Sequence, residues 1–274
     1  MGRIALVSRL AARDLRHRPA QAALLLVVIA AAMATLTLGL VLHGVTSQPY
    51  QQTRAATTGP DVVASSVGYP AGDQSSFAAL AHAPGVTAAS GPYPVAWPVL
   101  RVNGITADVM AEGRESAPAP VDQPQVLQGT WVGAGGVVVE RAFAEALGVR
   151  VGDQVTLDGR PFRVTGIAVT AAVPVFSQVC FYGGCSHQDG GHPAFDTGLV
   201  WLTQAAARAL ATPGNPVTYY LNLRLADPAA APAFVSQHQP PQGSGPPALT
   251  AWPGLDQAAA TLVAQEQRVL MPAS

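Results

Sequence analysis

The chain has 274 residues, a formal net charge of −1 and 49% hydrophobic residues, and all 15 of its basic residues are arginine. The near-neutral charge excludes a strongly basic face for nucleic acid. The absence of lysine excludes a P-loop, whose lysine contacts nucleotide phosphates, and a Schiff-base enzyme.

Residues 22–42 form an apolar segment without a single charged side chain. As a helix rising 1.5 Å per residue it is about 31 Å long, which matches a hydrocarbon core of about 30 Å. A cleaved signal peptide is the alternative, but its apolar region is usually about 7–15 residues long. We therefore expect a leader over 1–19 and a transmembrane helix over 20–43.

Arginines set the expected orientation of this helix. Five of them precede it, whereas Arg54 alone lies within twenty residues after it. The positive-inside rule then places the N-terminus in the cytoplasm and residues from about 44 onward outside the cell membrane. Arg9, Arg13 and Arg16 share one face of a leader helix and apolar residues share the other, which is typical of a helix on the membrane surface. An unstructured basic leader is the alternative.

Small residues recur within the predicted span. Ala31, Thr35 and Gly39 are spaced four residues apart, and such a stripe allows another membrane helix to approach closely. Alanine is common throughout the chain, so composition alone is the other explanation of the pattern.

The region after the span is rich in glycine and proline, which indicates turns and short strands. Asn103-Gly104 is typical of a two-residue hairpin, and residues 112–125 are polar and proline-rich, as in a connector. We expect, in chain order, a helix over 44–54, a strand over 61–65, a helix over 75–82, and strands over 95–103 and 105–110.

Residues 135–169 have the clearest local pattern. Val137–Val139 predicts a strand, and Arg141–Leu147 predicts a two-turn helix that ends at Gly148. Two strands with alternating apolar residues follow, joined by a turn at Asp158-Gly159. Helix, turn and strand signals agree here, so this is the most specific prediction of the sequence.

These segments together resemble a known family. The basic leader and span, "DVVAS" after the span, "VVVERAFAEALGVRVGDQVTLDGRPFRVTGI" and "DTGLVWLT" are similar to FtsX-like, or MacB-like, ABC transporter permeases. The resemblance implies an α+β fold, in which a transmembrane helix leads into an extracytoplasmic domain with a βαβ-containing subdomain and a small β-rich subdomain. The expected parts are the leader (1–19), the span (20–43), the first part of the core (44–125), the small subdomain (126–190) and the second part of the core (191–274).

The family also implies partners. ATP would be hydrolysed by a separate cytoplasmic ABC ATPase, the permease would work as a homodimer or heterodimer in the lipid membrane, and no nucleic acid or cofactor would be bound. The leader residues Arg9, Arg13 and Arg16 would couple to the ATPase, and Ala31, Thr35 and Gly39 would pack against another helix. Such permeases normally add three spans after the core, and residues 255–274 lead toward a second span that this sequence does not contain. We therefore expect either a truncated or fragmentary permease or a single-span relative.

Cys180 and Cys185 lie in the segment "CFYGGCSHQDGGH". Outside the membrane such a pair usually forms a disulfide. A metal site that adds His187 and His192 and a pair of free thiols are the alternatives, although the spacing matches no standard zinc pattern. We find no hydrolase motif and expect no enzyme. The alternative function is an anchored extracytoplasmic domain for binding, or for sensing redox state or metal, without transport.

Overall fold

The computed structural model describes residues 27, 29–30, 33–34, 49–66, 74–172, 197–239 and 248–251. The chain divides into two units, residues 1–49 and residues 50–274. In the first unit the described residues are helical. Within the described part of the chain, no helix combines the length and the apolar character that crossing a membrane requires. The second unit begins within α3 (Pro49–Ala56) and contains the elements described below.

Four strands, in the order β11-β1-β10-β2, form one end of an eleven-stranded sheet and are called here the four-stranded sheet. β2 continues into the rest of the sheet by pairing antiparallel with β4 (Ile105–Arg114) at Val95 and Ala96. β1 and β2 both run antiparallel to β10, and β11 runs antiparallel to β1. β1 and β2 are therefore parallel to each other with β10 between them, and β10 and β11 are parallel with β1 between them. A helix connects the two strands of each pair, as in split βαβ units. The elements are β1 (Val62–Ser65), α4 (Gln74–Ala81), β2 (Val86–Ala96), β10 (Thr218–Leu225), the short helix η1 (Pro228–Ala230), α7 (Ala231–His238) and β11 (Ala248–Ala251).

The chain between β2 and β10 builds a closed barrel. Each barrel strand pairs with the next in the order β4-β3-β7-β8-β6-β9, and β9 closes the ring by pairing in parallel with β4. β5 (Gln125–Gly129) pairs with β8 beside the ring. The barrel strands are β3 (Val99–Val102), β4 (Ile105–Arg114), β6 (Gly136–Glu140), β7 (Gln154–Leu157), β8 (Arg160–Val169) and β9 (Gly198–Thr203).

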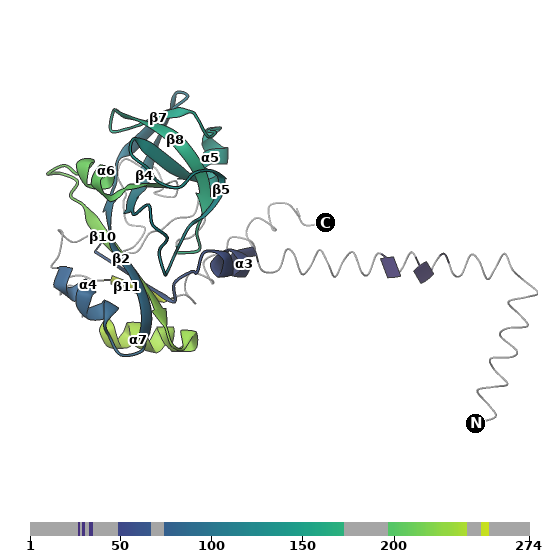
Figure 1. Cartoon of the computed structure of the whole chain (residues 1–274), viewed down its shortest axis with the longest axis vertical. Helices are drawn as coiled ribbons and strands as arrows, with labels where there is room; N and C mark the ends of the chain where they lie inside the picture. The colour runs from purple at the N-terminus through teal and green to yellow at the C-terminus, as the bar shows by residue number, and fades with distance from the viewer. Residues whose placement is uncertain are drawn as a thin grey trace, which may run out of the picture. The chain divides into compact units, whose positions relative to one another are not determined.

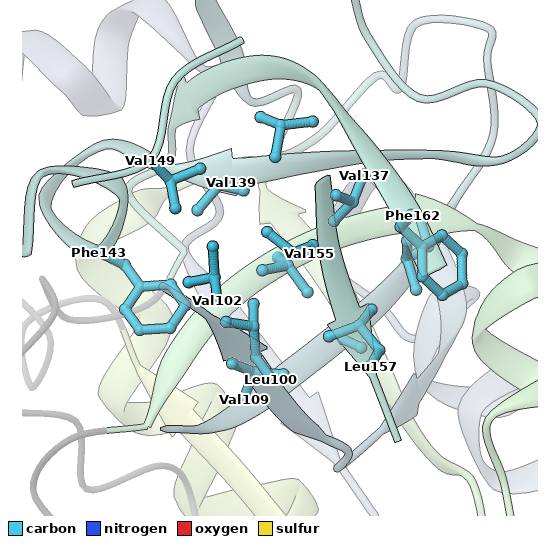
Figure 2. Close-up of a cluster of buried hydrophobic side chains, with 14 of the residues drawn as sticks. Leu100, Val102, Val109, Val137, Val139, Phe143, Val149, Val155, Leu157 and Phe162 are labelled. Carbon is cyan, nitrogen blue, oxygen red and sulfur yellow. The ribbon is translucent and has the colours of Figure 1, made fainter. Parts of the chain in front are cut away.

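Aliphatic side chains together with Phe143 and Phe162 fill the barrel. Leu100, Val109, Val137 and Leu157 are fully buried there, and Figure 2 shows the labelled side chains converging on one interior space. Phe143 comes from α5 (Arg141–Leu147) and packs against Gly198, where a Cβ atom would lie 2.2 Å from the ring. Strands with alternating inward side chains make such a barrel a packed core and not a pore.

A second core lies under the helices of the four-stranded sheet. Phe77 of α4 and Phe234 of α7 pack on inward residues of β1 and β10, including Leu221 and Leu223. Figure 1 shows α4 and α7 together at one end of this unit, and β7 and α5 at the other. The unit is therefore a mixed α+β domain, as the sequence predicts.

The local signals of the sequence are confirmed. Asn103 and Gly104 turn between β3 and β4 with positive φ angles of 51° and 77°, as a two-residue hairpin turn requires. Gly148 ends α5 with φ 65°, a left-handed conformation in which glycine meets no steric penalty. Asp158 and Gly159 form the predicted turn between β7 and β8.

Two predictions are corrected. The strand expected over 95–103 is two strands, because the chain leaves β2 at Ala96 and starts β3 at Val99; Pro98 between them has no N–H for a strand ladder. The connector expected from residue 112 starts later, because β4 continues through Arg114 beside β9.

Candidate functional site

The barrel wall and the four-stranded sheet meet in a layer of buried side chains, which we call the junction layer. It contains residues of β1, β2, β4, β6, β8, β9 and β10 and one residue of the loop before β6. Successive side chains of a strand point to opposite faces of the sheet. Val109 and Ala111 of β4 therefore point into the barrel, whereas Met110 points into the junction layer. Its buried members are Val63, Val95, Met110, Val132, Val138, Ala168, Leu199, Trp201 and Tyr220.

Charged residues of β4 enter the same layer. Glu112 and Arg114 follow Met110 at intervals of two, so they share its face of the strand. Glu112 is 5% exposed and Arg114 is 3% exposed. Arg114 Nη2 lies 3.1 Å from Glu112 Oε2, and its guanidinium lies 4.1 Å from the centroid of the Tyr93 ring on β2.

Asp122 is the second carboxylate of this cluster. It lies on the connector, defined here as residues 115–124, and is 1% exposed. Arg114 forms an ion pair with its side chain and donates from Nη1 to its main-chain oxygen at 2.7 Å. Asn222 of β10 donates to Asp122 Oδ2 at 3.2 Å, and Thr170 donates to Oδ1. Asp122 therefore joins β4, β10 and the end of β8.

Glu112 has fewer donors. Trp201 Nε1 on β9 donates to Glu112 Oε2 at 3.0 Å, and Arg114 approaches the same oxygen. Burial raises the pKa of Glu112 above its ordinary value, and the positive charge of Arg114 opposes that rise. Burial alone would lower the pKa of Arg114, but the negative charges of Glu112 and Asp122 raise it above its ordinary value. Arg114 therefore stays charged, whereas Glu112 is the group most easily neutralised.

The connector also holds the helix that enters the domain. The amides of Asp122 and Gln123 donate to the carbonyls of Thr58 and Thr57, at 2.9 and 2.8 Å. These two threonines directly follow α3. A chain of hydrogen bonds thus runs from the end of α3 through the connector to the cluster of Glu112, Arg114 and Asp122, which we call the ionic cluster.

A second contact, to a buried carboxylate, fixes α3 itself. Arg54 in the last turn of α3 forms an ion pair with Asp61, which is 1% exposed. Asp61 Oδ2 also accepts from the amide of Leu225 at 2.8 Å, at the end of β10. Gly59 packs on Arg54, where a Cβ atom would lie 2.7 Å from Arg54 Cγ. α3 is therefore attached both to the four-stranded sheet and to the connector.

An open cavity of about 540 Å³ borders the ionic cluster. It lies where the parallel strands β4 and β9 end, a place where α/β sheets often form crevices. Glu115 and Gln204 of α6 (Gln204–Ala209) face each other here, with Gln204 Nε2 3.3 Å from Glu115 Oε1. The lining residues are Arg114, Glu115, Ser116, Ala117, Val132, Gly133, Ala134, Thr203 and Gln204.

The site residues expected from the sequence lie outside the described residues. These are Arg9, Arg13 and Arg16 of the leader, Ala31, Thr35 and Gly39 of the span, and Cys180 and Cys185. Their roles, like the division into subdomains, stay predictions. Among the described residues, no group of three or more His, Cys, Asp or Glu side chains is arranged to hold a metal ion. The sequence did not predict the ionic cluster, because the expected strand ended at Met110. The two-residue spacing of Met110, Glu112 and Arg114 is a signal that could have extended the strand to Arg114.

Comparison with known families identifies the chain. Residues 22–240 match the family described as MacB-like periplasmic core domain. Because this match spans well over half of the chain, the protein belongs to that family, and its domain is of the periplasmic type found in ABC-type transporter permeases. No curated protein matches the chain.

Solved structures of three domains are similar to this chain at low identity. The extracellular domain of the noncanonic ABC-type transporter YknZ from Gram-positive bacteria is 12% identical with a TM-score of 0.39, over 69% of this chain and 98% of that one. The periplasmic region of MacB from Actinobacillus actinomycetemcomitans is 12% identical with a TM-score of 0.41, over 78% and 98%. A domain of a putative permease protein from Porphyromonas gingivalis is 13% identical with a TM-score of 0.34, over 69% and 88%.

Proposed function

We propose that this chain is a permease subunit of an ABC transporter and carries movement from the membrane into an extracytoplasmic domain. A separate cytoplasmic ATPase hydrolyses ATP, and the leader and span respond to it. The chain itself performs no catalytic step. The family match over residues 22–240 is the observation that carries this proposal, because it includes the apolar segment (22–42) as well as the domain.

The contacts of α3 support this role. A helix that follows a membrane span transmits a push or a rotation only if it is fixed to the domain beyond it. The pair of half-buried Arg54 with buried Asp61, together with the hydrogen bonds from the connector to Thr57 and Thr58, provides that attachment. Movement of α3 would therefore reach the four-stranded sheet through Asp61, and the barrel through the ionic cluster.

The test uses the full chain, purified in detergent from its host membranes together with the ATPase that accompanies it. The variant R9A/R13A/R16A removes the three leader charges. The control R101A/R150A/R160A removes three charges from exposed barrel residues. We expect the leader variant to lower ATP hydrolysis to the rate of the ATPase alone, and the control to retain the wild-type rate.

Two results would contradict the proposal. One is purification without any ATPase, and the other is a leader variant whose complex hydrolyses ATP at the wild-type rate. Either would favour the alternative, an anchored extracytoplasmic binding domain without transport. The cavity beside Arg114 is then the first place to look for a ligand.

A further inference from the structure

The ionic cluster contains one more negative group than positive. Arg114 is the only basic side chain that contacts Glu112 or Asp122 among the described ion pairs, and all three residues are buried. An uncompensated charge is costly in such a layer, so a buried group in excess tends to be neutralised. One proton would balance the cluster.

The geometry separates the two carboxylates. Asp122 accepts side-chain donors from Arg114, Asn222 and Thr170. The two donors of Glu112, from Arg114 and Trp201, both reach Oε2. The donors around Asp122 therefore stabilise its negative charge. In Glu112 both donors contact Oε2, so Oε1 is the oxygen on which a proton would sit.

We propose that Glu112 is a proton-binding site which makes the junction layer respond to the pH outside the membrane. With the proton bound, Arg114 and Asp122 form a balanced pair and the barrel wall packs tightly on the four-stranded sheet. When the proton leaves, an extra negative charge is buried between them and the junction layer loosens. The open cavity is lined by Arg114 and so brings solvent to one side of the cluster. This inference concerns the chain alone and holds whether or not an ATPase is its partner.

The other groups that face Glu112 come from β2, β4, β9, β10 and the connector. Tyr93 of β2 and Tyr220 of β10 adjoin the cluster, and burial raises the pKa of both phenols above the ordinary value of 10.0. Arg114 on β4 remains a cation and Asp122 is its ion-pair partner. Trp201 on β9 has no charge to gain or lose. Glu112 is therefore the group of this layer whose protonated form is favoured by burial.

The sign of the pH effect follows from the raised pKa of Glu112, whose ordinary value is 4.5. A group whose pKa is higher in the folded than in the unfolded state contributes its full stabilisation at pH values below the ordinary, unfolded-state pKa. The stabilisation is then lost as the pH rises through the folded-state pKa. Stability contributed by Glu112 should thus decline as the pH is raised from about 4.5, which is opposite to the usual behaviour of an ion-paired carboxylate.

The test compares urea midpoints of the full chain in detergent between pH 4.5 and 9. E112Q replaces the carboxyl with a neutral group of the same shape, and E115Q removes an exposed carboxylate three positions along the chain. We expect wild type and E112Q to agree at pH 4.5, and the wild-type midpoint to fall below that of E112Q as the pH rises. E115Q should follow the wild type.

Infrared difference spectra give a second readout on the folded protein. The carbonyl band of a protonated carboxyl should persist in wild type above the ordinary glutamate pKa of 4.5, be weaker in E112Q at the same pH, and keep its wild-type strength in E115Q. A wild-type and E112Q midpoint difference that does not change with pH would overturn the proposal. So would an E112Q chain that fails to fold, or a protonated-carboxyl band that is as strong in E112Q as in wild type at every pH.

Discussion

The barrel interior and the junction layer are built from opposite faces of the same strands, yet they are held together differently. β4 directs Val109 and Ala111 into an apolar barrel core and Glu112 and Arg114 into a layer that combines apolar packing with buried charge. Apolar packing depends on volume and tolerates change, whereas a buried ion cluster depends on every partner being present. The barrel is therefore expected to act as a rigid body, and the junction layer as the place where the domain can change.

The largest effect is expected from removing the cation of the junction layer. R114A leaves Glu112 and Asp122 buried without their partner, and we expect a loss of about 3–5 kcal/mol in the free energy of unfolding. Urea denaturation at neutral pH measures it. The control R141A breaks the exposed pair with Glu145, whose nitrogen–oxygen distance is 3.7 Å, and should cost less than about 0.5 kcal/mol.

A triple variant separates the effect of unpaired charge from the effect of lost packing. E112Q/R114M/D122N removes all three charges and keeps similar side-chain volumes, so no buried charge remains without a partner. We expect it to recover most of the stability that R114A loses. If the triple variant is as unstable as R114A, the loss in R114A comes from missing packing and not from unpaired charge.

The barrel core should respond to lost volume alone. L157A removes a fully buried side chain from the barrel interior, and we expect it to cost about 2–5 kcal/mol, depending on how far the cavity collapses. Because the described residues of that core are apolar, the loss should be the same at pH 5 and pH 8. A loss that changes strongly with pH would show that the two regions are not independent.

Gly113 lies between the two charged residues of β4 and sets how closely α6 packs. A Cβ atom there would lie 2.8 Å from Gln204 Cα and 2.9 Å from both Ala207 Cβ and Pro94 Cγ. G113A should cost about 1–3 kcal/mol through overpacking. G133A is the matched control, because nothing lies within 4 Å of its added Cβ, and it should change stability by less than about 0.5 kcal/mol.

The smallest effect is expected at the start of α5. The Glu140 side chain is buried and accepts from the amide of Phe143 at 2.9 Å, which caps the helix. E140A should cost about 1 kcal/mol, measured by thermal or urea unfolding. E145A, on the exposed side of the same helix, should cost clearly less; equal losses would argue against the capping role.

The sequence predicts best where the determinants are local. Gly148 and the Asn103-Gly104 pair fix a helix end and a hairpin through backbone conformations that few other residues adopt. The closure of the barrel is not local, since β4 and β9 pair in parallel across about ninety residues of chain. Composition also misled the prediction at residues 112–125, where polar residues indicated an exposed connector. Glu112, Arg114 and Asp122 are instead buried, because each finds its partner through tertiary contacts.

The most direct test of the account measures movement of α3 against the barrel in the complex with the ATPase. Spin labels at Q51C on α3 and R101C on β3 report their distance, in a chain carrying C180S and C185S. Labels at R101C and R160C report the barrel alone; all three labelled positions are exposed. We predict that ATP changes the distance between the labels at positions 51 and 101 and leaves the distance between those at 101 and 160 unchanged. Identical Gln51–Arg101 distances with and without ATP would contradict it.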